Sequence, residues 1–296
     1  MTTVVWSGRT VGSPALLLVG NAKASGVGAR RAALESATQA LRAAGARVEP
    51  HLTDSVGELG ALIEGADGRR LVVLGGDGSL HSLANLPHPP EAVALLPAGS
   101  ANNIAASLGI PLDLRAAARL AIEGRTRPID GIETRGPEGR YTALEGVSVG
   151  FLAQARVRYH GESSADITEG LRAGLAELGR FRPVEVSVMQ DGEAKTLSVS
   201  QLFVANMPRY AFGLHVAPAD PSDGLLDLVA IRTRTRVGLL AVLARLRRGT
   251  FSVASRRAER LLLRTAGSPV VADSTNLGAG LISVAAKRDA LRVVAP

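Results

Sequence analysis

Cysteine is absent from this sequence and aromatic residues are scarce, and each shortage excludes a class of protein. Without cysteine, the chain of 296 residues can form neither a disulfide nor a thiolate metal site. Aromatic residues make up 3% of the chain, too few for the stacking platforms that bind single-stranded nucleic acid, so we expect no nucleic-acid partner. The histidines show no zinc-like spacing: His51, His81, His88, His160 and His215.

Long apolar runs are also missing. No run approaches the ~18 apolar residues that a membrane-spanning helix needs. Residues 15–19 form an apolar stretch that is too short for the core of a signal peptide, and no basic cluster precedes it. With no cysteine and no span, we expect a cytoplasmic protein that would meet a membrane only peripherally, at its inner face.

Lysine is rare, so arginine supplies most of the positive charge behind the net charge of +7. Between Arg232 and Arg264 we count ten arginines against one acidic residue, Glu259. A helix is predicted over 236–248, with its apolar residues mostly toward the core and its arginines toward solvent. Such a cluster can attract anionic lipid headgroups, or it can simply be a solvated basic face. We expect a peripheral contact with anionic membrane.

What the chain does contain is the profile of a folded protein, with 46% hydrophobic and 21% charged residues. Its length suggests about two domains at roughly 150 residues each. Over residues 1–130, short apolar strands alternate with helices, which predicts an α/β domain built on a parallel sheet. Strands are expected at 16–19, 46–52, 71–74 and 92–96, and helices at 29–44, 56–66, 79–86 and from 103.

Beyond residue 130 the pattern becomes strand-rich. Alternating valines at 184–188, a hairpin turn at Asp191-Gly192 and a returning strand at 196–204 are typical of antiparallel structure. We therefore predict a second, β-sandwich-like domain over 131–296, whose last strand could pack back on the first domain. Further strands are expected at 129–134, 141–149, 225–231, 260–263 and 291–294, with helices at 166–178 and 236–248.

The segment Gly75-Gly76-Asp77-Gly78-Ser79, between a predicted strand and a predicted helix, is typical of a phosphate-binding turn. Glycines leave the backbone N–H groups open, and the start of a helix adds a positive partial charge. A bare phosphate site would not favour a carboxylate, so Asp77 indicates a magnesium ion or a reacting hydroxyl beside the phosphates. Taken alone, the motif could equally be a tight turn with an exposed aspartate.

Two further turns follow predicted strands of the same sheet. Pro97 to Ser100 is followed by Asn102 and Asn103, whose side chains can donate to phosphate oxygens or cap a helix. The turn from Gly20 to Gly26 contains Lys23, a candidate phosphate cation, although its spacing is not that of a P-loop. Because ligands of open parallel sheets bind at the carboxyl ends of the strands, three such turns favour a nucleotide site.

These turns resemble those of the diacylglycerol kinase catalytic family, which includes bacterial lipid kinases and sphingosine kinases and is more distantly similar to NAD kinases. Asn21 to Ser25 is similar to the family's Asn-Pro-x-x-Gly loop, with Ala22 in place of proline. Gly75 to His81 resembles its GGDGT-L-N segment, and Leu96 to Ala105 resembles its P-L-G-T-x-N-D-x-A segment.

The resemblance continues through the second half of the chain. Asp130 corresponds to the acid of the family's I-D-x-G turn, and Asn206 to Tyr210 is similar to a family segment that begins with asparagine. Ala217 to Asp227 resembles the long motif A-P-x-A-x-x-x-D-G-L-L-D. In the family this loop is similar to a structural magnesium site, which here would use Asp223 with the backbone carbonyls of Asp220 and Leu225. From the residues alone, these acids would be interpreted as a solvated surface turn.

The resemblance implies a kinase that binds ATP with Mg²⁺ and transfers the γ-phosphate to a hydroxyl of a diacylglycerol-like or other lipid acceptor. The oligomeric state is left open, a homodimer included. The nucleotide would contact all three turns and a threonine at the end of the second strand: Asn21, Ala22, Lys23, Ala24, Ser25, Thr53, Gly75, Gly76, Asp77, Gly78, Ser79, Leu80, His81, Gly99, Ser100, Asn102 and Asn103.

One departure from the family pattern concerns the group that takes the proton of the attacking hydroxyl. The family's acceptor strand ends Asp-Gly-Glu, whereas this chain has Asp273-Ser274-Thr275, so Thr275 stands in the place of the glutamate. A threonine hydroxyl is no base at neutral pH, and Asp77 or Asp273 could take over.

If the weak base limits the reaction, replacing Thr275 with glutamate should raise the rate. Two alternatives stay open beside an active lipid kinase. One is a catalytically weak or inactive nucleotide-binding homologue, and the other is a kinase of a soluble polyol or nucleotide.

Overall fold

The N-terminal half is built on buried parallel strands, because runs of leucine and valine can bury both faces of a sheet. The computed structural model describes residues 15–21, 27–66, 68–158, 167–250 and 254–296. Its first strands pair in parallel in the order β2-β1-β3-β4: β1 (Ala15–Asn21), β2 (Arg47–Thr53), β3 (Arg70–Gly75) and β4 (Val93–Pro97). The helices of this half are α1 (Val27–Ala43), α2 (Val56–Glu64), α3 (Asp77–Ala84), α4 (Asn103–Leu108) and α5 (Leu114–Glu123).

Alternate residues of these strands face different helices, as the two-residue period of a strand requires. Leu17 and Val73 pack in an apolar cluster with residues of α3 and α4. Leu16 and Leu18 point the other way and pack with residues of α1 and α5. Covered on both faces, the sheet holds the turns at the carboxyl ends of its strands in fixed positions.

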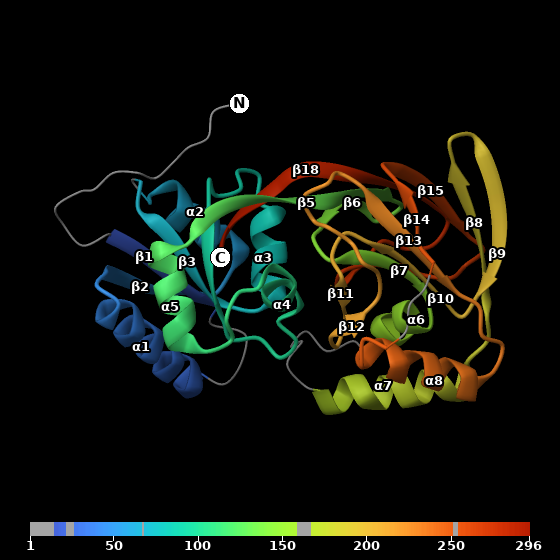
Figure 1. Ribbon diagram of the computed structural model, residues 1–296, viewed down its shortest axis with the longest axis horizontal. Coiled ribbons are helices and arrows are strands. Elements are labelled where there is room, and N and C mark those ends of the chain that lie inside the picture. Colours follow the sequence, from blue (N-terminus) through green and yellow to red (C-terminus); the bar gives the residue numbers. More distant parts are fainter. Residues whose placement is uncertain (1–14, 22–26, 67, 159–166, 251–253) are drawn as a thin grey trace.

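Two long strands join the halves of the molecule (Figure 1). β5 (Arg125–Gly136) and β18 (Leu281–Ala295) pair with each other in antiparallel fashion along most of their length. At its far end β18 also pairs in parallel with β4, through Val293 and Val93. The first sheet therefore continues into the second half through β15 (Arg260–Thr265), β8 (Val184–Gln190) and β9 (Glu193–Val199), with β6 (Gly139–Ala143) paired to β5.

A second, antiparallel sheet packs against this extension to form a β-sandwich. Its order is β14-β13-β10-β7-β16-β17, and valines and leucines of its inner face share one apolar cluster with β8, β15 and β18. The strands are β7 (Gly146–Gly150), β10 (Gln201–Ala205), β13 (Leu226–Ile231), β14 (Arg256–Ala258), β16 (Val270–Ala272) and β17 (Thr275–Asn276).

The outer face of the second sheet carries the remaining elements of the second half (Figure 1). Phe203 and Val229 of the sheet pack with Val242 and Leu246, which lie on the last helix. These elements are a short hairpin, β11 (Arg209–Tyr210) with β12 (Leu214–His215), and the helices α6 (Phe151–Arg158), α7 (Ile167–Arg180) and α8 (Arg236–Arg247).

The structure confirms the predicted fold class, a parallel-sheet α/β half followed by a β-sandwich half, and it corrects the prediction in two strands. The strand expected at 141–149 is two strands, because the backbone at Leu144 and Glu145 turns its N–H groups toward the Asp273 carboxylate. The strand expected at 196–204 is broken at Ser200, where the chain passes from one sheet to the other.

Two helices, α5 and α6, were not predicted. Asp113 caps α5 by accepting a hydrogen bond from the N–H of Ala116, a signal that the sequence carries. The expected domain boundary at residue 130 falls inside β5. Among the described residues, none of the helices has the length and apolarity needed to cross a membrane.

Candidate active site

Asp77 ties together the turns that follow β3 and β4. It is the first residue of α3 and follows Gly76 directly. Its carboxylate oxygens accept hydrogen bonds from the N–H groups of Asn103 (3.0 Å) and Ile104 (2.9 Å), at the start of α4. Burial raises the pKa of Asp77, although both hydrogen bonds favour its charged form. The carboxylate is thus fixed where the starts of two helices meet.

The two turns touch through glycine backbone. A Cβ atom added at Gly99 would lie 2.6 Å from the Cα of Gly76, and one added at Gly76 would lie 2.7 Å from the Cα of Gly99. Asn102 holds the second turn, since its side chain accepts from the N–H of Gly99 (3.0 Å) and donates to the carbonyl of Gly99 (2.7 Å). Side chains are excluded from this contact, which leaves two bare backbone segments beside Asp77.

The other predicted nucleotide residues line up at the same edge of the sheet. Asn21 and Thr53 are paired at the ends of β1 and β2, and Gly75 is paired with Pro97 at the ends of β3 and β4. Ser79 is half-buried, whereas Gly78 and Ser100 are exposed. The predicted contacts Ala22, Lys23, Ala24 and Ser25 lie outside the described residues.

Four of the predicted nucleotide residues are buried, namely Thr53, Leu80, His81 and Asn103. Leu80 is fully buried in the apolar cluster between the sheet and α3, because the α3 face that carries it packs on the strands. His81 is buried as well, and its imidazole turns toward the β-sandwich half. The Leu80 side chain is therefore enclosed by the core, and that of His81 faces the cluster between the two halves and not the sheet edge.

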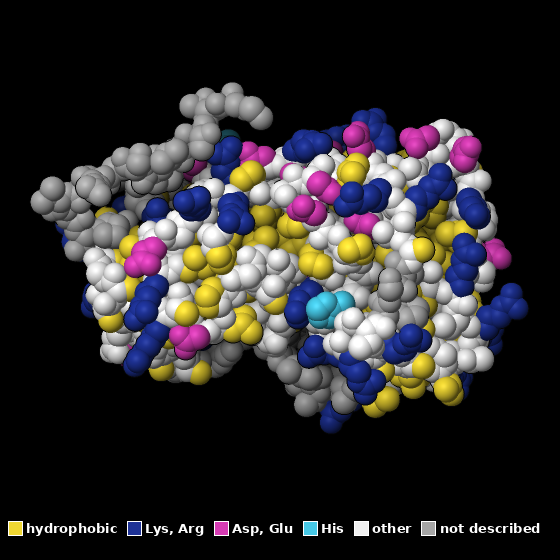
Figure 2. All heavy atoms as spheres, in the orientation of Figure 1, with side chains coloured by type: hydrophobic (Ala, Val, Ile, Leu, Met, Phe, Trp, Pro, Cys, Tyr) yellow, Lys and Arg dark blue, Asp and Glu magenta, His cyan; other side chains and the backbone are white. Residues whose placement is uncertain are grey.

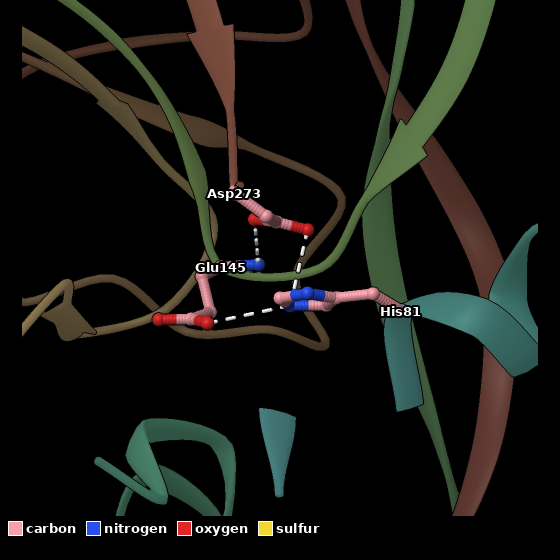
Figure 3. A group of neighbouring side chains, drawn as sticks. All are labelled: His81, Glu145 and Asp273. Atoms are coloured by element: carbon pink, nitrogen blue, oxygen red, sulfur yellow. Dashed lines mark hydrogen bonds and ion pairs between the residues drawn. The ribbon is translucent and has the colours of Figure 1, made fainter. Parts of the chain in front are cut away.

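His81, Glu145 and Asp273 form a buried charged cluster between the two halves (Figure 3). The His81 Nε2 atom lies 3.3 Å from Glu145 Oε1 and 3.2 Å from Asp273 Oδ2. Asp273 also accepts hydrogen bonds from the N–H groups of Leu144 (2.8 Å), Glu145 (2.9 Å) and Gly146 (3.0 Å). Three elements meet here: α3, the link between β6 and β7, and the turn between β16 and β17.

The pKa values in this cluster are shifted by burial and by one another's charges. Burial opposes the charging of His81, but the carboxylates of Asp273 and Glu145 outweigh it and raise the pKa of His81 to about 9. Burial raises the pKa of Glu145 to about 7 against the opposing hydrogen bond from His81, and repulsion from Asp77 adds to the rise. The neighbouring carboxylates thus favour the charged form of His81, while burial favours the neutral form of Glu145.

Asn103 connects this cluster to Asp77. Its backbone N–H donates to Asp77, and its side-chain Nδ2 donates to Glu145 Oε2 (2.8 Å) and to the carbonyl of Ala211. The Asn103 Oδ1 atom is buried and has no hydrogen-bond partner among the described residues. Asn103 thus lies between the carboxylates of Asp77 and Glu145, and its Oδ1 atom is an acceptor without a partner among the described residues.

Thr275, which the resemblance aligns with the family's glutamate, is partly exposed in β17. Asp273 has no exposed side-chain surface, and its carboxylate already binds three N–H groups and His81. It lies in the left-handed conformation (φ 51°), as the tight turn between β16 and β17 requires. Asp273 therefore organises the cluster and is not free to meet a substrate.

The predicted magnesium ligands lie in the loop before β13. Asp220 accepts from the N–H (3.0 Å) and hydroxyl (2.6 Å) of Ser222. Asp223 accepts from the N–H of Leu225 (2.9 Å) and from the Arg257 guanidinium (2.7 Å). A cation bound by Asp223 would share this carboxylate with Arg257 or displace it, and the metal at this loop stays a prediction.

The residue that sequence reasoning missed is Glu145. A signal was present, since Glu145 is the one acidic residue in the strand-like stretch 141–149. A lone charge in such a stretch is either exposed or buried with partners, and the partners come from segments that lie far away in sequence.

Both halves of the chain match known protein families. Residues 15–134 match the family model described as "Diacylglycerol kinase catalytic domain", and residues 147–295 match the "YegS C-terminal NAD kinase beta sandwich-like domain". A diacylglycerol kinase of Mycobacterium tuberculosis (strain ATCC 25618 / H37Rv) is 30% identical over 233 residues, covering 72% of each chain. A protein of Klebsiella pneumoniae (strain 342), named "Probable lipid kinase YegS-like", is 36% identical over 123 residues, covering 40% of each. The solved structure of a diacylglycerol kinase from Bacillus anthracis str. Sterne superposes with a TM-score of 0.69 at 19% identity, covering 97% of this chain and 98% of that one.

Proposed function

The chain belongs to the diacylglycerol kinase family of lipid kinases, and on that premise we propose that it transfers the γ-phosphate of ATP to a hydroxyl of a lipid acceptor. The observation that carries the proposal is the Asp77 carboxylate, fixed between the starts of α3 and α4 beside two touching glycine turns. Exposed backbone N–H groups and helix N-termini bind phosphate groups. A carboxylate there would repel the phosphates unless it binds a metal ion or interacts with a reacting proton.

The sheet edge fits a nucleotide. A Cβ atom on either Gly76 or Gly99 would overlap the opposite turn, so glycine at both positions is what lets the two turns pack together at this edge. The side chains of Asn21 and Thr53 lie at neighbouring strand ends of the same edge. Family membership implies ATP as the phosphate donor, and phosphoryl transfer usually uses a divalent cation.

Mg²⁺ would accompany the nucleotide, where it would neutralise charge on the phosphates. Within the part of the chain that the structure describes, Asp77 supplies the carboxylate beside the glycine turns, and it would face that ion. The N–H groups of Asn103 and Ile104 fix the orientation of Asp77, so the carboxylate would not have to reorganise when the nucleotide binds.

In the proposed reaction the acceptor oxygen attacks the γ-phosphorus and a new P–O bond forms. The bond between that phosphorus and the β,γ-bridging oxygen breaks, the acceptor loses its proton, and ADP leaves. Such transition states are loose, so positioning and charge stabilisation carry most of the catalysis. The glycine turns and Asp77 serve both purposes.

The test is the transfer of labelled γ-phosphate from ATP to a panel of acceptors: diacylglycerol, monoacylglycerol, sphingosine, phosphatidylglycerol, a soluble polyol and NAD. We expect wild type to label a lipid and Asp77→Asn to lose at least about 10²-fold in rate. The matched control is Asp113→Asn, because Asp113 also accepts a helix N–H but caps α5. Thermal melting checks that both variants are folded.

Three results would contradict the proposal. Labelling of the polyol or NAD alone would make the protein a kinase of a soluble acceptor. Labelling of no acceptor, with ATP still bound, would make it an inactive nucleotide-binding homologue. An Asp77→Asn variant as fast as wild type would show that this carboxylate does not take part in the reaction.

A further inference from the structure

We propose that Glu145 accepts the proton of the attacking hydroxyl, and so supplies the base that Thr275 cannot. This inference rests on the proposed kinase function and adds to it a catalytic residue. Glu145 lies on the link between β6 and β7, at the boundary between the two halves, and its carboxylate points into the buried cluster shown in Figure 3.

The position of Glu145 next to the phosphate turns is set by Asn103. The backbone of Asn103 binds Asp77 and its side chain binds Glu145, so one residue spans the gap between the two carboxylates. If the γ-phosphate lies against Asp77, an acceptor oxygen attacking it would approach from the side of Asn103 and Glu145. Because only 6% of the Glu145 side chain is exposed, direct contact requires the neighbouring side chains to move when the acceptor binds. The buried Oδ1 of Asn103, which has no hydrogen-bond partner within the described part of the chain, is an additional acceptor for the incoming hydroxyl.

The other carboxylates of the site are less suited to the task. Asp273 is fully enclosed and bound by three N–H groups, and Asp77 is held by two N–H groups on the phosphate side. Asn103 itself is neutral, at a position where the family pattern quoted above has an aspartate. Glu145 has one oxygen bound by Asn103 and the other 3.3 Å from His81 Nε2.

The surroundings of Glu145 set its proton affinity near neutral pH. The titratable groups that face it are His81 and Asp77 on α3, Asp273 on the β16–β17 turn, Tyr141 on β6 and Tyr210 on β11. Burial, together with repulsion from Asp77, raises the pKa of Glu145 to about 7. The contact with His81 lowers this pKa and so limits the rise. A base whose pKa lies near the working pH combines proton affinity with a large ionised fraction.

The step balances without a further reactant. The acceptor oxygen forms its bond to the γ-phosphorus, its proton passes to a carboxylate oxygen of Glu145, and the bond to the β,γ-bridging oxygen breaks as ADP leaves. Afterwards the proton returns to solvent. His81 positions Glu145 through the ion pair and does not itself contact the acceptor.

The experiment compares kcat, KM for ATP and the pH–rate profile of wild type, Glu145→Gln, Glu145→Asp and the control Glu133→Gln, which makes the same change on β5 away from the cluster. Because the base must be ionised, the wild-type kcat should rise as pH increases through about 7. Glu145→Gln should lower kcat about 10²- to 10⁴-fold, leave KM for ATP within a fewfold range and lose this rise with pH. Glu145→Asp should keep the rise at a reduced rate.

Wild-type kcat and an unchanged pH profile in Glu145→Gln would overturn the inference while leaving the kinase function in place. A wild type that transfers phosphate to no acceptor would instead overturn the function and this inference with it. Because Glu145 already supplies a carboxylate, Thr275→Glu should not raise the rate. A gain of tenfold or more in that variant would show that the base is missing, and would contradict the assignment to Glu145.

Discussion

At the scale of single residues, the site depends on one histidine that holds two carboxylates together. His81 lies between Glu145 and Asp273, and all three side chains are almost completely buried. Removing one member of a buried ion pair typically costs about 3–5 kcal/mol, because the remaining charge is left without a partner. The His81 imidazole therefore stabilises the fold and also lowers the pKa of Glu145.

His81 should make the protein less stable as pH rises. Its pKa is raised from 6.5 to about 9 in the folded state, so its stabilising contribution is complete below pH 6.5 and is lost as pH rises through about 9. We expect the free energy of unfolding of wild type to fall between pH 6.5 and 9, and His81→Asn to be less stable at pH 6.5 and flatter over this range. Urea denaturation at several pH values measures this, with the exposed His88→Asn as control. Parallel pH curves for wild type and His81→Asn would contradict it.

At the scale of elements, α7 and α8 form a surface that combines basic and apolar side chains. Leu239 and Leu243 of α8 pack with Phe181 and Leu178 at the end of α7. The prediction that the apolar residues of α8 mostly face the core holds for Leu239, Val242 and Leu246.

Other apolar side chains of these helices face outward, namely Val237 (77% exposed), Leu240 (48%) and, on α7, Leu175 (60%). Figure 2 shows Lys and Arg side chains gathered over this part of the molecule, with hydrophobic ones along its lower edge. The α7–α8 surface has the mixture expected of a peripheral membrane contact.

The α7–α8 surface should bind anionic vesicles. Each arginine near a negative membrane contributes about 1 kcal/mol, and salt screens the attraction over ~10 Å at 0.1 M. Wild type should therefore sediment with vesicles in proportion to their anionic lipid and be released by salt. A variant that combines Arg245→Gln, Arg247→Gln and Arg248→Gln should bind these vesicles at least about tenfold more weakly. The control makes the same charge change at exposed Arg125, Arg127 and Arg140 on β5 and β6. Equal sedimentation of the two triple variants would exclude a specific role for α8.

At the scale of the whole molecule, the layers of the fold could be predicted from local sequence patterns, whereas the site is assembled by contacts between segments that lie far apart in the sequence. The buried strands, the glycine turns and the hairpin at Asp191-Gly192 follow from periodicity and turn chemistry, which act over a few residues. The long pairing of β5 with β18 joins segments more than a hundred residues apart and leaves no local signal. The same is true of the cluster, since His81, Glu145 and Asp273 lie on three distant segments and only the packed fold brings them together.

A crystal structure with Mg²⁺ and a non-hydrolysable ATP analogue tests the proposed site most directly. We expect the phosphates to lie over the contact between Gly76 and Gly99, with the γ-phosphate facing Asp77 on one side and the Asn103 and Glu145 side chains on the other. A γ-phosphate directed away from Asp77, or a nucleotide bound elsewhere than at the ends of β1 to β4, would contradict it.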